Sequence, residues 1–336
     1  MNNLLSIENL RTTFKTYAGD VQAVRDVSLT VREGECLAVV GESGSGKSVT
    51  MLSVMRLLAS NARIEGKALF GGVDLLSLPE REMRKIRGRE ISMVFQDPMT
   101  GLNPTLTVGL QLREGMMYHL GLSRAEADKR AVELLNLVGV PEPERRLKQY
   151  PHEFSGGMRQ RVMIAIALAC NPRLIIADEP TTALDVTIQA QILDLLKRLK
   201  KEFNTSIIMI THNLGVVAGM ADRVVVMYGG RVAEVGTVEE IFEEPKHPYT
   251  WALLRAVPRL DRSARERRLE AIPGSPPNML QPPPGCPFHP RCPYAMNVCA
   301  AEAPAMTPLS DEHRAACWLL HPDAPPVEFP QEVTEA

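Results

Sequence analysis

Hydrophobic and polar residues follow two different periods along this chain. Short apolar runs predict buried strands, and they stand at 35–40, 91–95, 174–177, 206–210 and 224–227. Apolar residues three or four positions apart predict helices between those runs, at 47–58, 122–138, 158–169 and 186–203. Residues 4–14 and 27–31 alternate more strictly, which indicates an antiparallel edge sheet. Strands that alternate with helices predict an α/β fold with a largely parallel sheet covered on both faces.

The composition is that of a globular protein. Hydrophobic residues make up 45 % and charged residues 23 % of the 336 residues, which excludes a chain that is disordered throughout. The net charge of −2 argues against a nucleic-acid partner. No apolar stretch approaches the roughly 20 residues of a membrane span, and the N-terminus lacks the pattern of a signal peptide. We therefore expect a soluble protein in the cytoplasm.

Proline marks a change of character late in the chain. Of the 26 prolines, 15 lie between Pro273 and Pro330. We expect a core domain at 1–255 and a small Cys/Pro-rich C-terminal region at 256–336. The arginine-rich segment at 255–268, where the two meet, is expected to be a solvated linker.

A glycine-rich turn separates the predicted strand at 35–40 from the helix at 47–58. It matches the phosphate-binding pattern G-x-x-x-x-G-K-[ST], in the strand–loop–helix context that the pattern requires. Backbone N–H groups can curl round phosphate oxygens there, next to the positive end of a helix. Lys47 would neutralise the β- and γ-phosphates, and the Ser48 hydroxyl would ligate Mg²⁺. The predicted nucleotide contacts are Gly41, Glu42, Ser43, Gly44, Ser45, Gly46, Lys47, Ser48 and Val49.

Two carboxylates end the predicted strand at 174–177. Asp178 and Glu179 would lie at the carboxyl edge of a parallel sheet, where ligands bind in α/β folds. Asp178 would hold Mg²⁺, directly or through water, and Glu179 would polarise an attacking water as general base. The pattern is weak alone, since many buried strands end in an acid, and it gains meaning beside the phosphate loop.

A third segment, Phe154-Ser155-Gly156-Gly157-Met158, stands just before a predicted helix. Ser155 is a good N-cap, and the glycines leave backbone N–H groups open to an anion. Taken alone, the segment is more simply a capped helix start.

The order of these motifs resembles the ATP-binding cassette (ABC) ATPases over residues 4–245. Gln96 follows a predicted strand, Asp185 follows the acidic strand, and His212 follows the next strand. The resemblance implies ATP and Mg²⁺ as ligands. It also implies a phosphate-loop nucleotide-binding domain with a parallel-sheet core, an antiparallel edge sheet and a helical subdomain at about 97–165.

The resemblance further implies roles for single residues. Gln96 would contact Mg²⁺ and sense a membrane subunit, and His212 would contact the γ-phosphate and orient Glu179. The implied catalytic residues are thus Glu179, His212, Lys47 and Gln96. Tyr17 or Phe14 would stack on adenine.

Other implied contacts cross to a second ATPase subunit. Ser155, Gly156 and Gly157 would bind the γ-phosphate of ATP held by that subunit, and Asp185 would cross the interface. Phe154 and Met158 replace the usual Leu and Gln of this signature and leave the Ser and Gly residues intact.

Four further segments resemble the peptide-importer branch of the family. They are 95–104, 150–161, 246–250 and 272–277. The resemblance is to the first of two paired ATPase chains in bacterial oligopeptide importers, and it implies ATP hydrolysis that drives peptide import. The implied partners are a second, different ATPase subunit, two transmembrane permease subunits and an extracytoplasmic peptide-binding protein. The implied location is peripheral, at the cytoplasmic face of the inner membrane.

Two alternatives stay open at this point. The chain could serve a dipeptide or nickel importer, because substrate choice belongs to other subunits. It could also be a non-transport cassette protein, although such proteins usually join two cassettes in one chain or insert a long coiled coil, and this chain does neither.

Four of the six cysteines, Cys286, Cys292, Cys299 and Cys317, fall within 32 residues near the C-terminus. Four thiolates suit an iron–sulfur cluster or zinc, and the closely spaced pairs usual for zinc do not occur here. Some peptide-importer ATPases with a similar tail hold a [4Fe–4S] cluster. We therefore expect a [4Fe–4S] cluster, with zinc or free thiols as the alternatives.

Overall fold

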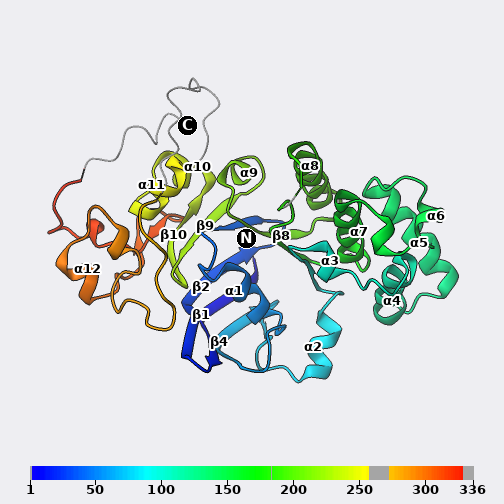
Figure 1. Cartoon of the computed structure of the whole chain (residues 1–336), viewed down its shortest axis with the longest axis horizontal. Helices are drawn as coiled ribbons and strands as arrows, with labels where there is room; N and C mark the ends of the chain where they lie inside the picture. Colours follow the sequence, from blue (N-terminus) through cyan, green and yellow to red (C-terminus); the bar gives the residue numbers. More distant parts are fainter. Residues whose placement is uncertain (1, 183, 257–271, 328–336) are drawn as a thin grey trace. The chain divides into compact units, whose positions relative to one another are not determined.

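The computed structural model describes residues 2–182, 184–256 and 272–327 (Figure 1). The chain divides into two compact units. Unit 1 comprises the first three residues, Val31–Cys36 and Ser77–Ile210, and unit 2 comprises Leu4–Thr30, Leu37–Leu76 and Thr211–Ala336. The part of the predicted arginine-rich linker that follows residue 256 lies outside the described residues.

Three parallel strands form the sheet of unit 1. They are β6 (Ile91–Val94), β7 (Leu174–Asp178) and β8 (Ser206–Thr211), with β7 paired to both of the others. Every residue of β7 is buried, as expected for a parallel strand covered on both faces. The carboxyl ends of β6 and β7 therefore lie at the same edge of the sheet.

Helices make up most of the rest of unit 1. They are α2 (Glu80–Ile86), α3 (Pro98–Gly101), α4 (Val108–Leu120), α5 (Arg124–Leu137), α6 (Pro143–Arg146), α7 (Gly156–Leu168) and α8 (Val186–Phe203), with the short 3₁₀ helix η1 (Pro151–Glu153). Helices α4, α5 and α7 pack against one another (Figure 1). The predicted capping box at the start of α5 is confirmed: the Ser123 backbone N–H donates to Glu126 Oε2 at 2.8 Å, and the Ser123 hydroxyl accepts from the Glu126 N–H.

Unit 2 contains strands from both ends of the chain. Strand β3 (Cys36–Val40) pairs in parallel with β9 (Arg223–Tyr228), and β9 pairs antiparallel with β10 (Arg231–Thr237). Two short strands of the C-terminal region continue this order, because β12 (Arg314–Ala315) pairs with β10 and β11 (Thr307–Pro308) pairs with β12. The C-terminal region is thus joined to the sheet by backbone hydrogen bonds.

The predicted antiparallel edge sheet is present, with longer strands than the sequence indicated. Its order is β2 (Gly19–Arg32), β1 (Asn3–Thr16), β4 (Ala62–Phe70) and β5 (Val73–Asp74). Strand β4 is antiparallel to both β1 and β5.

The helices of unit 2 are short. They are α1 (Lys47–Val54), α9 (Leu214–Ala218), α10 (Val238–Glu243), α11 (Pro248–Arg255) and α12 (Asn297–Ala301), with the 3₁₀ helices η2 (His289–Arg291) and η3 (Trp318–Leu320). The prediction of a helix over 47–58 is wrong at its end, because Arg56 adopts a left-handed backbone with φ of 53°. In the part of the chain that the structure describes, no helix is both long and apolar enough to span a bilayer.

A buried polar cluster ties the C-terminal region to β10. Glu234 is fully buried and accepts hydrogen bonds from the backbone N–H groups of Lys246 (2.6 Å) and His247 (3.0 Å). His313, from the C-terminal region, donates from Nε2 to Glu234 Oε1 at 2.7 Å. His247 in turn caps α11, since its Nδ1 accepts from the Tyr249 N–H at 3.0 Å. Burial lowers the pKa of His247 from 6.5 to about 4.

This shift predicts a pH-dependent stability. Below pH 6.5 the unfolded chain protonates His247 and the folded chain does not, so the free energy of unfolding falls as the pH drops from 6.5 to about 4. The loss through this group is about 3 kcal/mol. His247→Asn keeps a capping side chain and removes the titrating ring, so the variant should lose that part of the pH dependence. Denaturant unfolding at several pH values measures it.

The exposed His152 provides the control, since His152→Asn should unfold with the pH dependence of the wild type. A His247→Asn variant with an unchanged pH dependence would contradict the neutral, buried state of His247.

Candidate nucleotide-binding site

The predicted phosphate loop runs from the end of β3 to the start of α1 in unit 2. Its close backbone approaches require glycine. A Cβ on Gly46, whose φ is 96°, would lie 2.5 Å from the carbonyl oxygen of Ala23, and one on Gly41 would lie 2.2 Å from that of Met227. The loop is therefore a tightly supported turn with its backbone curled at the start of a helix.

Lys47 is buried within this loop, with 5 % of its surface exposed. Its Nζ donates to the carbonyl oxygens of Gly41 (2.7 Å) and Glu42 (3.0 Å). The buried Ser45 hydroxyl has no hydrogen-bond partner among the described residues. A buried cation, an unpartnered hydroxyl and a helix start fit an anionic phosphate group.

The carboxylates predicted to act in catalysis lie at the end of β7 in unit 1. Asp178 is buried, and Glu179 follows it with a left-handed φ of 45°. Two side chains donate to Glu179 Oε2, each at 2.9 Å: Gln96 through Nε2 and Thr182 through Oγ1. The structure thus brings Gln96 and Glu179, two of the predicted site residues, together and adds Thr182, which sequence reasoning missed.

The Ser-Gly-Gly segment begins α7 on an exposed part of unit 1. Ser155 is the N-cap, and its hydroxyl accepts from the Met158 N–H at 3.4 Å. Asp185 caps α8 in the same way, accepting from the Ile188 N–H at 3.0 Å. Ser155, Gly156 and Asp185 are all exposed on unit 1.

The remaining predicted residues lie in unit 2. Tyr17 is fully exposed near the turn between β1 and β2, and His212 is exposed just after β8. Unit 2 therefore carries the phosphate loop, Tyr17 and His212, and unit 1 carries Gln96, Asp178, Glu179 and the Ser-Gly-Gly segment. The roles assigned to these residues stay predictions.

An arginine of the C-terminal region holds the phosphate loop. The Arg291 side chain is 4 % exposed and forms a two-pronged ion pair with Glu42, with N–O distances of 2.6 and 3.1 Å. It also donates to the Tyr228 hydroxyl at 2.9 Å and to the carbonyls of Ile272 and Pro273. The hydrogen bonds that Arg291 donates to Glu42 raise the pKa of Arg291, so its guanidinium stays charged.

Tyr249 adds a second anchor for the loop, accepting from the Glu42 N–H at 2.8 Å. Sequence reasoning missed both anchors. Arg291 and Glu42 are 249 positions apart, and no local pattern connects them.

The predicted [4Fe–4S] site is wrong. Within residues 2–182, 184–256 and 272–327, no group of His, Cys, Asp and Glu side chains is arranged to hold a metal ion. The same finding argues against the zinc alternative. The four C-terminal cysteines form no disulfide bonds. Burial raises the pKa of Cys292 to about 11 and that of Cys317 to about 12, so both side chains are protonated thiols at neutral pH in this structure.

Comparisons with known proteins agree with this site. The family described as "ABC transporter" matches residues 24–182, and the one described as "Oligopeptide/dipeptide transporter, C-terminal region" matches residues 233–299. Among solved structures, the dimeric post-hydrolysis state of the ATP-binding cassette MJ0796 bound to ADP and Pi is similar, with a TM-score of 0.63 and 32 % identity. The similarity covers 70 % of this chain and 98 % of that one.

Two curated relatives extend the similarity over nearly the whole chain. The oligopeptide transport ATP-binding protein OppD of Bacillus subtilis (strain 168) is 57 % identical over 99 % of this chain and 93 % of its own. The dipeptide transport ATP-binding protein DppD of the same organism is 56 % identical over 95 % of each. The fold and site thus define an ABC ATPase, which confirms the predicted fold class and family. Within that family, the chain belongs to the ATP-binding subunits of the oligopeptide/dipeptide transporters.

Proposed function

We propose that this chain binds and hydrolyses ATP to drive the import of oligopeptides through a membrane ABC transporter. The observation that carries the proposal is the buried Lys47 in a tightly supported phosphate loop, in a chain 57 % identical to an oligopeptide transport ATP-binding protein. The energy of ATP binding and hydrolysis would be passed to the membrane subunits.

The site residues divide the work of hydrolysis. The phosphate loop and Lys47 bind the β- and γ-phosphates, and Ser48, Gln96 and Asp178 would hold Mg²⁺. When bound, Mg²⁺ offsets the negative charge of these phosphates. Glu179 accepts a proton from the attacking water. The hydrogen bonds that Gln96 and Thr182 donate to its carboxylate fix that group in one orientation. His212 would contact the γ-phosphate.

The exposed caps support a partnership with a second, different ATPase subunit. Ser155, Gly156 and Gly157 would bind the γ-phosphate of ATP held by that subunit, and Asp185 would line the interface. Their exposure on unit 1 leaves the backbone N–H groups at the start of α7 accessible to an anion.

Apolar side chains on α3 and α4 support docking to permease subunits. Met99 is 48 %, Met117 43 % and Tyr118 67 % exposed. Covering exposed apolar side chains removes them from water, which favours association with a partner. The proposed location is peripheral, at the cytoplasmic face of the membrane, with two permease subunits and an extracytoplasmic peptide-binding protein completing the importer.

A dipeptide importer is the second candidate, because DppD of Bacillus subtilis (strain 168) is 56 % identical to this chain. The two candidates use the same ATPase chemistry and differ in the length of the peptide carried.

Peptide uptake by cells that carry Lys47→Ala tests the proposal and separates the candidates. We expect uptake of labelled peptides of three to six residues to fall at least about fivefold, because the variant loses the cation that binds the phosphates. Lys201→Ala, which changes an exposed lysine of α8, is the matched control and should retain uptake.

Loss of dipeptide uptake alone would move the chain to the dipeptide importers. Unchanged uptake of every peptide, with the variant expressed at the wild-type level, would refute peptide import.

A further inference from the structure

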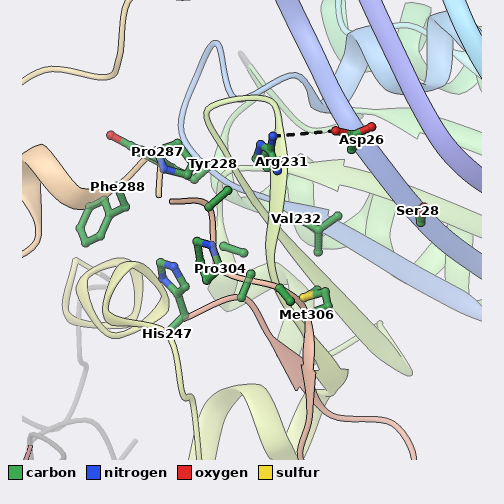
Figure 2. Close-up of a pocket in the computed structure, with 14 residues that line it drawn as sticks. Asp26, Ser28, Tyr228, Arg231, Val232, His247, Pro287, Phe288, Pro304 and Met306 are labelled. Carbon is green, nitrogen blue, oxygen red and sulfur yellow. Dashed lines mark ion pairs between the residues drawn. The ribbon is translucent and has the colours of Figure 1, made fainter. Parts of the chain in front are cut away.

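A cavity of about 320 Å³ lies within unit 2, between β10 and the C-terminal region (Figure 2). Its volume is in the range of small-molecule sites. Phe288, Pro304 and Met306 supply apolar walls, and Val232 of β10 supplies another. An apolar cavity with a few polar groups is the usual form of a site for a small organic molecule.

His247 lines this cavity with its imidazole ring. The side chain is 3 % exposed, and its Nδ1 accepts a hydrogen bond from the Tyr249 N–H. Burial lowers the pKa of the ring to about 4, so the ring is neutral at pH 7. The single proton of the neutral ring is therefore on Nε2. The ring thus presents an N–H donor among the groups that line the cavity.

Arg231 and Asp26 are the charged groups at the opposite wall. Arg231 lies 3.8 Å from Asp26, which forms a closer ion pair of 2.5 Å with Arg11 (Figure 2). Arg231 Nε is buried without a hydrogen-bond partner among the described residues. Burial, and after it the charge of Arg231, lowers the pKa of the Arg25 guanidinium. Arg231 shares Asp26 with Arg11, and its buried Nε is open to a further anion.

We propose that this cavity binds a small organic carboxylate with an apolar body. The carboxylate pairs with Arg231, whose guanidinium matches its planar geometry. The apolar body packs against Phe288, Pro304 and Met306, and His247 Nε2–H donates to a second acceptor of the same molecule. No phosphate-loop residue lines this cavity, so the site is separate from the nucleotide site.

Three fluorinated probes of the same shape and different charge test the proposal on the full-length chain. The probes are 4-fluorophenylacetate, 4-fluorobenzyl alcohol and 4-fluorobenzylamine. Their binding is measured by ¹⁹F NMR while MgADP occupies the phosphate loop. We expect 4-fluorophenylacetate to bind with a Kd of about 1 mM or below and the amine to bind at least about tenfold more weakly. Equal affinities for the three probes, or no binding of any of them, would overturn the proposal.

Two substitutions assign the binding to this cavity. Arg231→Gln should weaken the binding of 4-fluorophenylacetate at least about tenfold and leave the affinity for the neutral alcohol unchanged, because only the charged pair is lost. His247→Asn keeps the cap of α11 and removes the buried Nε2 donor, so it should weaken the carboxylate by a smaller factor. Melting temperatures of both variants show that they fold. An unchanged affinity in a folded Arg231→Gln variant would exclude this cavity as the site.

Discussion

Replacing Glu179 by glutamine is expected to leave ATP bound and to lower the rate of ATP hydrolysis by about 100-fold or more. The variant keeps the size of the side chain and one oxygen that can accept from Gln96 or Thr182. It removes the negative charge that accepts a proton from the attacking water. Binding should persist, because the phosphate loop and Lys47 lie in unit 2 and are unchanged.

Two measurements separate binding from chemistry in this variant. Titration with a fluorescent ATP analogue gives the affinity, and phosphate release gives the turnover rate. Glu202→Gln, at an exposed acidic position of α8, is the matched control and should hydrolyse ATP at the wild-type rate. Near-normal hydrolysis by Glu179→Gln would remove Glu179 from the proposed role.

Replacing Arg291 by alanine is expected to lower the free energy of unfolding by about 3 kcal/mol. Arg291 is almost fully buried, and its loss leaves the Glu42 carboxylate and the Tyr228 hydroxyl without their shared donor. The figure is at the lower end for buried pairs, because Glu42 is 27 % exposed and water can solvate it in part. The phosphate loop also loses one of its supports, so we expect weaker ATP binding.

Denaturant unfolding and nucleotide titration check both effects. Arg291→Lys keeps the charge but not the two-pronged geometry, so it should recover only part of each loss. Arg314→Ala removes an exposed arginine from the same C-terminal region and serves as the control. If Arg291→Ala and Arg314→Ala unfold with the same free energy, the ion pair with Glu42 contributes nothing to stability.

The buried strands could be predicted because parallel strands covered on both faces are apolar at every position. Strands β3, β7 and β9 all appear in the sequence as short apolar runs. Strand β10 could not be predicted, because Arg231 and Glu234 interrupt its pattern. Glu234 is nevertheless buried, since Lys246, His247 and His313 supply its hydrogen bonds. Those partners are 12 to 79 positions away, beyond any local pattern.

The same distinction between local patterns and distant partners applies to the candidate site. The phosphate loop, Asp178 and Glu179 are short contiguous motifs whose strand and helix neighbours could be identified in the sequence. Arg291 carries no local signature, and only the folded chain places it beside Glu42, 249 positions away. The cysteine spacing led to a wrong prediction, because it reports residue types and not how the folded chain arranges their side chains, which form no metal-binding group among the described residues.

The pairing of β12 with β10 has a consequence for any shortened form of this protein. A chain cut at the end of α11 would lose β12 and leave the outer backbone groups of β10 without partners. It would also lose His313 and so expose one side of the buried Glu234. An unpaired strand edge recruits other strands, so the shortened chain should self-associate and precipitate where the intact chain does not.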